Sequence, residues 1–440
     1  MKLKTFPGGL HPPDNKFWSA HKPIENCPMP DEFIVPFAQH IGVPAVPAVE
    51  VGQHVSKGQV LGTAKGFVSV PVHAPTSGEV LALEPRPHPS GVAMPAVVIK
   101  PDGEDRWIDG LEKCDPEQLT PEEISEKIRA AGVVGMGGAT FPTHVKLSPP
   151  EEKKIDTLIL NGVECEPFLT ADHRLMLEET DRLLKGVAIL QKVLGVEHVA
   201  IGIEANKPDA ISLLQERCKG TPFVVEPLEV KYPQGAEKQL ILAVTGREVP
   251  SGGLPMDVGV VVHNVGTAAA IADAVIEGKP LIERICTVTG PAIKEPKNLR
   301  IRIGTPLQHL VEICCGTVEE PAKIIMGGPM MGSTQVDLSV MTTRGTSGLL
   351  LLREQDITGR SEGPCIRCSR CVEVCAMNLL PTTIAAYARR DLLAEAEEYH
   401  ALDCIECGCC SYTCPSSIPL VQIIRYAKTG IMEQKRKQAS

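Results

Sequence analysis

Long apolar runs are absent from this sequence. No stretch approaches the roughly 20 consecutive apolar residues that a membrane-spanning helix needs. Residues 1–9 also lack the hydrophobic core of a signal peptide. These absences predict a chain that works in the cytoplasm or at the periphery of a membrane.

Clustered positive charge is absent as well. The 44 Lys and Arg residues are outnumbered by 54 Asp and Glu residues, which gives a formal net charge of −10. Because binding to nucleic-acid phosphates depends on grouped Lys and Arg, we expect no nucleic-acid partner. The 43% of hydrophobic residues is typical of a soluble globular protein, and 440 residues suffice for about three or four domains.

The order of segments along the chain indicates how these domains are arranged. Residues 33–100 are short apolar stretches between Gly and Pro turns, which predicts a small all-β unit. An α/β unit follows, because strand-like apolar runs alternate with helical patterns. The expected strands are 157–160, 199–203, 223–225 and 259–262, and the expected helices are 121–131, 172–194, 207–217, 236–245 and 268–277. Residues 281–352 return to short strands, and residues 381–403 predict a long helical connection in a helical last domain.

The cysteines carry the clearest chemical pattern. Two groups repeat the spacing C-x2-C-x2-C-x3-C, which is the pattern of a ferredoxin with two 4Fe-4S clusters and implies a reducing compartment. The first group is Cys365, Cys368, Cys371 and Cys375, and the second is Cys404, Cys407, Cys410 and Cys414. In this pattern the fourth cysteine of each group reaches the other cluster, so Cys375 should bind the second cluster and Cys414 the first.

Zinc is the alternative metal for these cysteines. Zinc sites usually pair two C-x2-C segments and do not need eight thiolates in an ordered repeat, so we favour iron–sulfur clusters. The extra Cys409 is interpreted as a spectator thiol. Arg367 and Arg370 either offset the charge of a cluster or lie in solvent.

A glycine-rich loop precedes the first α/β strand. Its residues Gly135, Gly137 and Gly138 leave backbone amides bare enough to approach an anionic group, and Lys146 follows as a partner for a phosphate. Such loops are commonly only turns. The loop follows a helix, so it is not a Rossmann fingerprint.

Polar residues also follow the predicted strands, where open α/β sheets bind ligands. Three more segments have this character, and with the glycine loop they could converge on one pocket. Their residues are Asn161, Glu164 and Glu166, then Tyr232 and Glu237, then Asn264 and Thr267. The alternative is a capped loop with solvated acids. A flavin suits such a pocket, because nicotinamides transfer hydride whereas each cluster accepts one electron.

These four segments, in order, resemble the flavin- and NADH-binding subunit of respiratory complex I over residues 124–276. The resemblance implies that FMN is held by Gly135, Gly137, Lys146, Asn161, Tyr232, Asn264 and Thr267. It also implies that Glu164, Glu166, Phe141 and Glu237 lie beside the isoalloxazine or receive the nicotinamide nucleotide. Two residues depart from the family pattern, since Val163 replaces an Asp and Ala236 replaces a Glu.

The whole chain resembles the C subunit of the Rnf complex, an ion-pumping ferredoxin:NAD oxidoreductase. The segments typical of that family are residues 6–13, 66–78 and 327–332. The resemblance implies a multidomain α/β protein with β-rich and all-α parts. Its domains would be a barrel-sandwich hybrid (1–104), an FMN- and NADH-binding α/β domain (105–280), a β-grasp domain (281–355) and a helical two-cluster ferredoxin-like domain (356–440).

The expected function is a peripheral subunit on the cytoplasmic face of the membrane. It would exchange hydride between NAD(H) and FMN and pass single electrons through two 4Fe-4S clusters to the other subunits of the complex, and indirectly to or from ferredoxin. Two alternatives stay open: a soluble NADH dehydrogenase subunit of a hydrogenase-like complex, and a non-catalytic relay with a decayed flavin pocket.

Several isolated residues are interpreted as structural. Lys65 falls where a lipoyl-type domain presents its modified lysine, but the usual flanking acid is missing. Cys165 is a lone cysteine between two acids and is interpreted as a packing residue. His144, His173 and His263 have no metal-ligand spacing.

Overall fold

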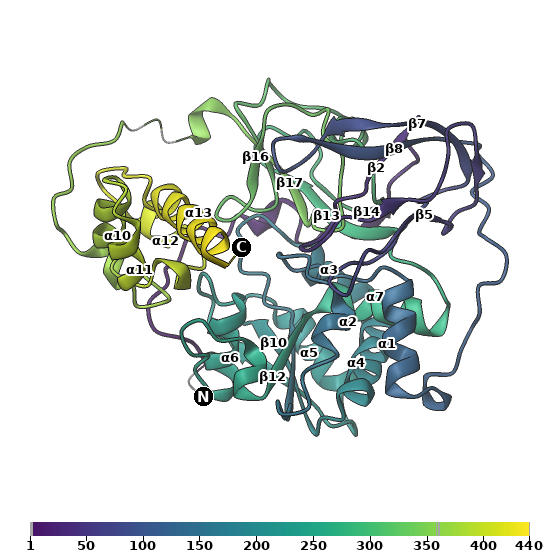
Figure 1. Cartoon of the computed structure of the whole chain (residues 1–440), viewed down its shortest axis with the longest axis horizontal. Helices are drawn as coiled ribbons and strands as arrows, with labels where there is room; N and C mark the ends of the chain where they lie inside the picture. The colour runs from purple at the N-terminus through teal and green to yellow at the C-terminus, as the bar shows by residue number, and fades with distance from the viewer. Residues whose placement is uncertain (1–2, 358, 360, 440) are drawn as a thin grey trace.

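The computed structural model describes residues 3–357, 359 and 361–439. Figure 1 shows the β-rich and α/β parts packed together and the helical part, in yellow and light green, standing to one side of them. The expected fold class, a multidomain α/β chain with β-rich and all-α parts, is confirmed.

The first β-rich unit is built from two antiparallel sheets. One has the order β2-β8-β7-β4 and the other the order β3-β5-β6. Their strands are β2 (Phe33–Pro36), β3 (Val46–Pro47), β4 (His54–Val55), β5 (Val60–Thr63), β6 (Val72–His73), β7 (Gly78–Pro87) and β8 (Ala93–Pro101). Fully buried Phe33, Leu61 and Ile99 lie in the core between these sheets. This is the all-β unit predicted from residues 33–100.

The α/β unit contains a parallel sheet with the order β11-β10-β9-β12. Its strands are β9 (Thr157–Asn161), β10 (His198–Glu204), β11 (Phe223–Leu228) and β12 (Val260–Asn264). Side chains of β9 alternate between two cores, because Leu158 and Leu160 pack in one and Ile159 in the other. The first core is covered by α1 (Pro121–Ala130), α3 (Ala171–Glu178), α4 (Thr180–Leu194), α5 (Pro208–Arg217) and α7 (Val265–Ile276). Helix α6 (Glu237–Thr245) covers the second.

The helix predicted over 172–194 is interrupted. Glu179 takes the non-helical angles φ −125° and ψ 30°, which separates α3 from α4. Its carboxylate forms ion pairs with Arg182 and Arg300, and the Thr180 hydroxyl donates to the Met176 carbonyl at 2.6 Å. Tertiary ion pairing therefore overrides a helical pattern that contains no Gly or Pro at this point.

The second β-rich unit is a sheet with the order β1-β14-β13-β17-β15-β16. Its strands are β1 (Ile24–Asn26), β13 (Glu283–Thr289), β14 (Lys297–Arg302), β15 (Lys323–Met326), β16 (Ser333–Gln335) and β17 (Gly348–Leu352). Helix α8 (Leu307–Ile313) packs on it through Leu307 and Leu310. Strand β1 comes from the amino-terminal segment and pairs in parallel with β14, so residues 24–26 belong to this sheet rather than to the barrel.

The last unit is helical, as predicted, but without one long connection. Its helices are α9 (Arg370–Glu373), α10 (Pro381–Ala388), α11 (Leu393–Glu398), α12 (Cys409–Tyr412) and α13 (Leu420–Ala439). Asp391 and His400 have φ of 56° and 61° and interrupt the expected helix over 381–403. Short elements complete the chain: 3-10 helices Lys16–Trp18, Pro116–Gln118, Pro255–Val258, Glu354–Asp356 and Ala401–Asp403, and helix α2 (Thr143–Lys146).

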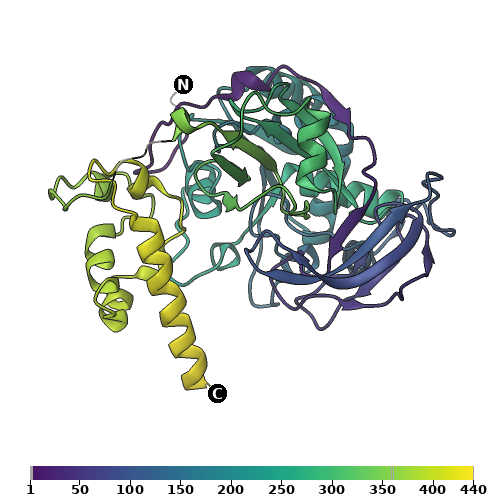
Figure 2. The ribbon, with the colours of Figure 1, turned by 90° about the horizontal axis from the view of Figure 1, so that it is seen from above.

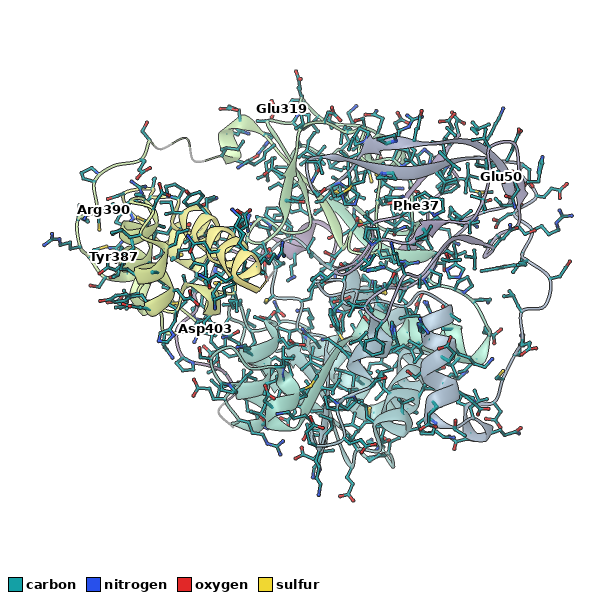
Figure 3. The ribbon with its side chains drawn as sticks, viewed as in Figure 1. Phe37, Glu50, Glu319, Tyr387, Arg390 and Asp403 are labelled. Carbon is teal, nitrogen blue, oxygen red and sulfur yellow. The ribbon has the colours of Figure 1, made fainter. Side chains whose placement is uncertain are left out.

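The helical unit docks on the α/β unit through a few polar contacts. Figure 3 labels Asp403 on the side that faces the α/β unit, with Tyr387 and Arg390 on the opposite side. The Ser251 hydroxyl and the Gly252 N–H both donate to the Asp403 carboxylate, at 2.5 Å and 3.1 Å. These contacts fix which surface of the helical unit meets the α/β unit.

Candidate functional site

The four predicted polar segments converge at the carboxyl ends of β9 and β12. Asn161 ends β9 and donates from Nδ2 to the Gly235 carbonyl at 2.8 Å. Asn264 ends β12, and its Nδ2 lies 3.5 Å from the Asn161 carbonyl oxygen. A Cβ atom added to Gly137 would lie 3.0 Å from the Cβ of Asn264. The segments therefore meet as the sequence predicted.

Hydrogen bonds hold the base of the glycine loop, and its tip is open. The Met136 N–H donates to the Thr267 hydroxyl at 2.8 Å, and the Gly135 N–H donates to the Phe141 carbonyl at 2.9 Å. Gly137 and Gly138 are exposed at the tip, and Gly138 has φ 148° with no atom of the described residues within 4 Å of an added Cβ. This open cradle beside the first turn of α7 suits an anionic group such as the phosphate of FMN.

Lys146 and Glu237 form an ion pair across this site. The Nζ atom of Lys146 lies 2.7 Å from the Glu237 Oε1 atom and donates to the Val262 carbonyl at 3.2 Å. Both side chains are partly exposed. Lys146 is thus anchored beside β12, with charge available to a ligand on the cradle.

Several predicted binding residues are engaged within the protein. Asn264 caps α7 by accepting from the Gly266 N–H at 2.8 Å, and it donates to Asp172 at 2.7 Å. Glu164 accepts from the N–H groups of Asp172 and His173, at 2.7 Å and 3.2 Å, at the start of α3. These residues shape the loops, and their roles toward a cofactor stay predictions.

Glu166 reaches toward the β-grasp sheet. Its carboxylate accepts from the N–H groups of Met330 and Met331, at 3.1 Å and 2.8 Å, and the Tyr232 hydroxyl oxygen lies 3.5 Å from it. Burial raises the pKa of Glu166 to about 7, although these hydrogen bonds and Lys16 oppose the shift. The predicted catalytic carboxylate therefore sits at a joint between domains.

Tyr232 links this joint to the second cysteine group. Its hydroxyl donates to the Cys407 carbonyl at 2.8 Å, and its side chain is 1% exposed. Gly408, the next residue, lies against Met330, with 3.1 Å between an added Cβ and the Met330 carbonyl oxygen. The second group is thus packed directly against residues predicted to bind the flavin.

Cys375 lies among the cysteines of the second group. With Cys404, Cys407 and Cys410 it lines a cavity of about 20 Å³. Backbone N–H groups donate to two of the sulfurs, from Leu379 to Cys375 at 3.3 Å and from Glu406 to Cys404 at 3.4 Å. Such N–H···S contacts are typical of iron–sulfur sites, so this donor set suits a cluster with the predicted crossed ligation.

The first group is more exposed. Residues 364–370, which include Cys365 and Cys368, are all exposed, whereas Cys371 is buried. Burial raises the pKa of Cys371, and the neighbouring Cys368 and Cys414 add to that shift. Cys414 thus lies with the first group, which is again the predicted crossing.

No three His, Cys, Asp or Glu side chains among the described residues converge closely enough to hold a single metal ion. His144, His173 and Cys165 have partners within the protein, whereas the buried Nε2 atom of His263 has no hydrogen-bond partner among the described residues. The His144 Nε2 atom lies 2.8 Å from the Phe67 carbonyl oxygen, His173 contacts Asp209 at 2.8 Å, and burial lowers the pKa of His263 to about 3. Cys165 accepts from the Gly235 N–H at 3.4 Å, and Lys65 is exposed.

Sequence reasoning missed three titratable groups near these loops: Asp172, Lys16 and Lys207. Burial raises the pKa of Asp172 to about 7, with Glu164 adding to the shift. Asp172 carried no signal because it falls at the start of a predicted helix. Lys16 and Lys207 lie in segments outside the motif residues, and only the tertiary structure brings them beneath the turn after β9.

Two further features lie outside this site. A larger cavity of about 710 Å³ is lined by ion-paired residues such as Arg182, Asp273 and Arg300, away from the glycine loop. Within the described residues, no helix is both long and apolar enough to cross a membrane.

Family models match successive parts of the chain. They are the RnfC barrel sandwich hybrid domain at residues 4–104, the Nuo51 FMN-binding domain at 128–273, the SLBB domain at 285–334 and the 4Fe-4S dicluster domain at 364–418. FMN and 4Fe-4S clusters, predicted from the sequence, are thereby confirmed as the cofactors of these domains.

Curated relatives match over nearly the whole length. The chain is 51% identical to the C subunit of the proton-translocating ferredoxin:NAD(+) oxidoreductase complex of Clostridium ljungdahlii, over 97% of this chain and 94% of the relative. It is 48% identical to the Na(+)-translocating counterpart of Acetobacterium woodii, over 99% of each. It is 43% identical to the C subunit of the ion-translocating oxidoreductase complex of Rhodobacter capsulatus, over 98% of this chain and 84% of the relative.

Solved structures give a weaker likeness. An NAD+-reducing [NiFe]-hydrogenase in the H2-reduced state aligns with 72% of this chain and 63% of its own, at a TM-score of 0.49 and 17% identity. A likeness at this level carries no argument about the chain.

Proposed function

We propose that this chain, which belongs to the family of C subunits of ion-translocating ferredoxin:NAD(+) oxidoreductase complexes, exchanges hydride with NAD(H) at the glycine-loop site and passes single electrons through its cysteine groups. FMN supplies the conversion between two-electron and one-electron chemistry when bound. The chain supplies binding, orientation and the path to the clusters.

The cradle residues bind and orient the flavin in this proposal. Gly135, Gly137 and Gly138 present bare backbone to the phosphate, with the first turn of α7 beside them. Lys146 adds a positive charge anchored at the Val262 carbonyl, 3.2 Å away. Phe141, Glu164 and Glu237 lie at the edges, where the nicotinamide nucleotide is proposed to enter.

The second cysteine group receives electrons first. The observation that supports this order is the hydrogen bond of 2.8 Å from the Tyr232 hydroxyl to the Cys407 carbonyl. It joins a proposed flavin residue to a proposed cluster ligand. The first group, with Cys365 and Cys368 exposed, then delivers electrons to another subunit of the complex.

In this proposal the chain docks on the cytoplasmic face of the membrane. Eight cysteines at iron–sulfur spacing are suited to a reducing compartment, and NAD(H) is the substrate named for the relatives' complexes. Docking on membrane subunits would be peripheral.

The departures at Val163 and Ala236 do not favour a relay without flavin. Val163 is fully buried in the core beside α6, with Leu228 and Leu240, so this position faces away from the cradle. Ala236 precedes α6 as its N-cap residue. Neither residue obstructs the glycine loop.

An anaerobic visible spectrum of the chain reconstituted with FMN and clusters tests the proposal. Addition of NADH should bleach flavin and cluster absorption together. A chain whose clusters respond to dithionite while NADH changes neither band would contradict hydride exchange at this site. If NADH does bleach both bands in the wild-type chain, a Lys146→Met variant should lose this response to NADH and keep its clusters.

A further inference from the structure

Residues 3–26 form an amino-terminal strap that touches three other domains before the chain enters the barrel (Figures 1 and 2). Leu10 and Tyr232 exchange two backbone hydrogen bonds of 2.8 Å. The Gly9 N–H donates to the Val374 carbonyl at 3.0 Å, next to Cys375. Strand β1 of the strap joins the β-grasp sheet. The strap therefore ties together the α/β, helical and β-grasp domains.

Lys16 extends from the strap beneath the turn formed by residues 163–169. Its side chain is only 7% exposed. Its Nζ atom donates to the carbonyl oxygens of Glu166, at 3.0 Å, and Leu169, at 2.5 Å. This turn carries Glu164 and Glu166, the two acids proposed to lie near the nicotinamide. The strap thus contributes a buried cation to the turn's backbone.

A second buried ammonium group supports the same turn from inside the α/β domain. Lys207 is fully buried and donates to the Val163 carbonyl at 2.7 Å. Its Nζ atom lies 3.3 Å from an oxygen of Glu204, which is 1% exposed. Three carbonyl groups of one turn are therefore held by two buried cations.

The turn needs this support because its backbone is strained. Glu164 and Phe168 have φ of 49° and 70°, in the left-handed region that side-chain-bearing residues rarely adopt. Such a residue is strained and persists only where its surroundings hold it. The strap provides a further tie, since the Phe168 N–H donates to the Asp14 carbonyl at 2.7 Å.

The acids around Lys16 offset only part of the effect of its burial. Burial lowers the pKa of Lys16 and Lys207 lowers it further, whereas Glu164 and Glu204 raise it. An isolated buried cation is unfavourable unless it is paired. A purely mechanical tie could be made by a neutral side chain, so the use of a charged one beside two acids points to an electrostatic role as well.

We propose that Lys16 is a positioning residue for the nucleotide site. It fixes the turn at residues 163–169 and thereby the placement of Glu164 and Glu166 relative to the flavin cradle. This inference rests on the proposed function for its catalytic consequence. The same strap contacts Val374 through Gly9, seven residues before Lys16, so one segment aligns the nucleotide site with the second cysteine group.

A Lys16→Met substitution in the full chain, loaded with FMN and clusters, tests the proposal. Loss of the ammonium group leaves two carbonyls unpaired, so backbone amides of residues 160–172 should exchange with deuterium faster. The NADH concentration that half-reduces the flavin should rise about tenfold, which corresponds to about 1.4 kcal/mol. FMN content and cluster content should stay at wild-type values.

Lys57→Met is the matched control. Lys57 is 8% exposed and pairs with Asp105 at 2.8 Å, so its loss removes a similarly buried cation whose partner lies outside the turn. It should leave both readouts unchanged. Equal effects from the two variants, or unchanged exchange in Lys16→Met, would overturn the proposal.

A second variant covers the case in which Lys16→Met does not fold, and the exchange experiment covers the case in which the proposed function fails. If Lys16→Met does not fold, Lys16→Gln, which is shorter and uncharged but still a donor, should give faster exchange in the turn than wild type. Wild-type-like exchange in Lys16→Gln would overturn the proposal. If NADH fails to reduce the wild-type flavin, the proposed function fails, while the exchange experiment still decides whether Lys16 holds the turn.

Discussion

The two cysteine groups have the same spacing but different surroundings. In the second group Cys410 is buried and Cys404 and Cys407 are partly buried, whereas Cys365 and Cys368 of the first are exposed. The Tyr232 hydroxyl reaches the Cys407 carbonyl at 2.8 Å. Ile366, between the first two cysteines of the first group, is 65% exposed. The same local motif therefore lies in an inner position in one group and in an outer position in the other, because the second group packs against the α/β unit.

This difference supports the proposed order of the two clusters along the electron path, which the spacing cannot supply. A cluster packed between Tyr232 and the Met330 loop is suited to exchange with the flavin. A cluster at an exposed loop is suited to exchange with another subunit. Substitutions that affect one cysteine group and not the other test this difference.

The largest effect is expected from Cys375→Ser. Cys375 belongs to the first group in sequence but lines the cavity of the second, so this variant should lose the second cluster and keep the first. NADH should then no longer reduce the remaining cluster. Iron content and the electron paramagnetic resonance of the reduced protein measure both effects. Cys409→Ser, at a buried neighbouring thiol, is the control that should keep both clusters, and loss of the first cluster in Cys375→Ser would contradict the crossed ligation.

Lys146→Met tests whether the glycine-loop site binds FMN. Losing a charge-assisted hydrogen bond to the ligand should weaken FMN binding by about 1.5–3 kcal/mol, or roughly 10- to 100-fold. Fluorescence titration of the apoflavin protein measures this affinity. Lys153→Met removes a lysine paired with Asp257 at 2.8 Å, away from the loop, and should leave FMN affinity unchanged. Unaltered affinity in Lys146→Met would argue against the cradle.

Glu166→Gln tests the joint between the two cofactor regions. The pKa of Glu166 is raised to about 7 by burial, so the folded chain binds this proton more tightly than the unfolded chain. The stability from this group is full below about pH 4.5 and falls as pH rises toward 7, by up to about 3 kcal/mol. Glutamine does not titrate, so the free energy of unfolding of the variant should gain on wild type between pH 5 and 8. Parallel pH profiles measured by denaturant unfolding would contradict this placement.

The smallest effect is expected from Tyr232→Phe. Loss of the hydroxyl removes one buried hydrogen bond to the Cys407 carbonyl, worth about 1 kcal/mol. Hydrogen exchange in residues 404–414 should increase modestly. Tyr426→Phe removes a hydroxyl that contacts Asp391 at 2.5 Å on an exposed helix face, and should leave that segment unchanged. Equal exchange in both variants would weaken the inner assignment of the second cluster.

Much of the architecture could be predicted because it depends on local patterns. Alternation of strand-like and helical patterns located β9, β10, β11 and β12 within a few residues. The break at Glu179 could not be predicted, because it depends on Arg300 from a distant strand. The interruption of the helix over 381–403 depends on left-handed residues at Asp391 and His400, and no Gly or Pro marks either position.

The candidate site shows the same division. Its four segments were found because a glycine-rich loop follows a helix, and amides and acids follow buried strands. The direction of Glu166 toward Met330 and Met331 was not foreseen, since those backbone donors come from another domain. Lys16 was missed because a single lysine in an irregular segment has no periodic or spacing signal.

The sequence by itself determined the chemistry of this protein: eight cysteines at cluster spacing, a glycine loop with Lys146, and polar residues at strand ends. Short-range geometry suffices for these features, because ligand spacing and strand ends are local properties of the chain. Only the tertiary structure decided which cluster is inner, which residues hold the turn at 163–169, and where Glu166 points. Those features depend on contacts between residues 44 to 175 positions apart, which only the packing of the folded chain brings together.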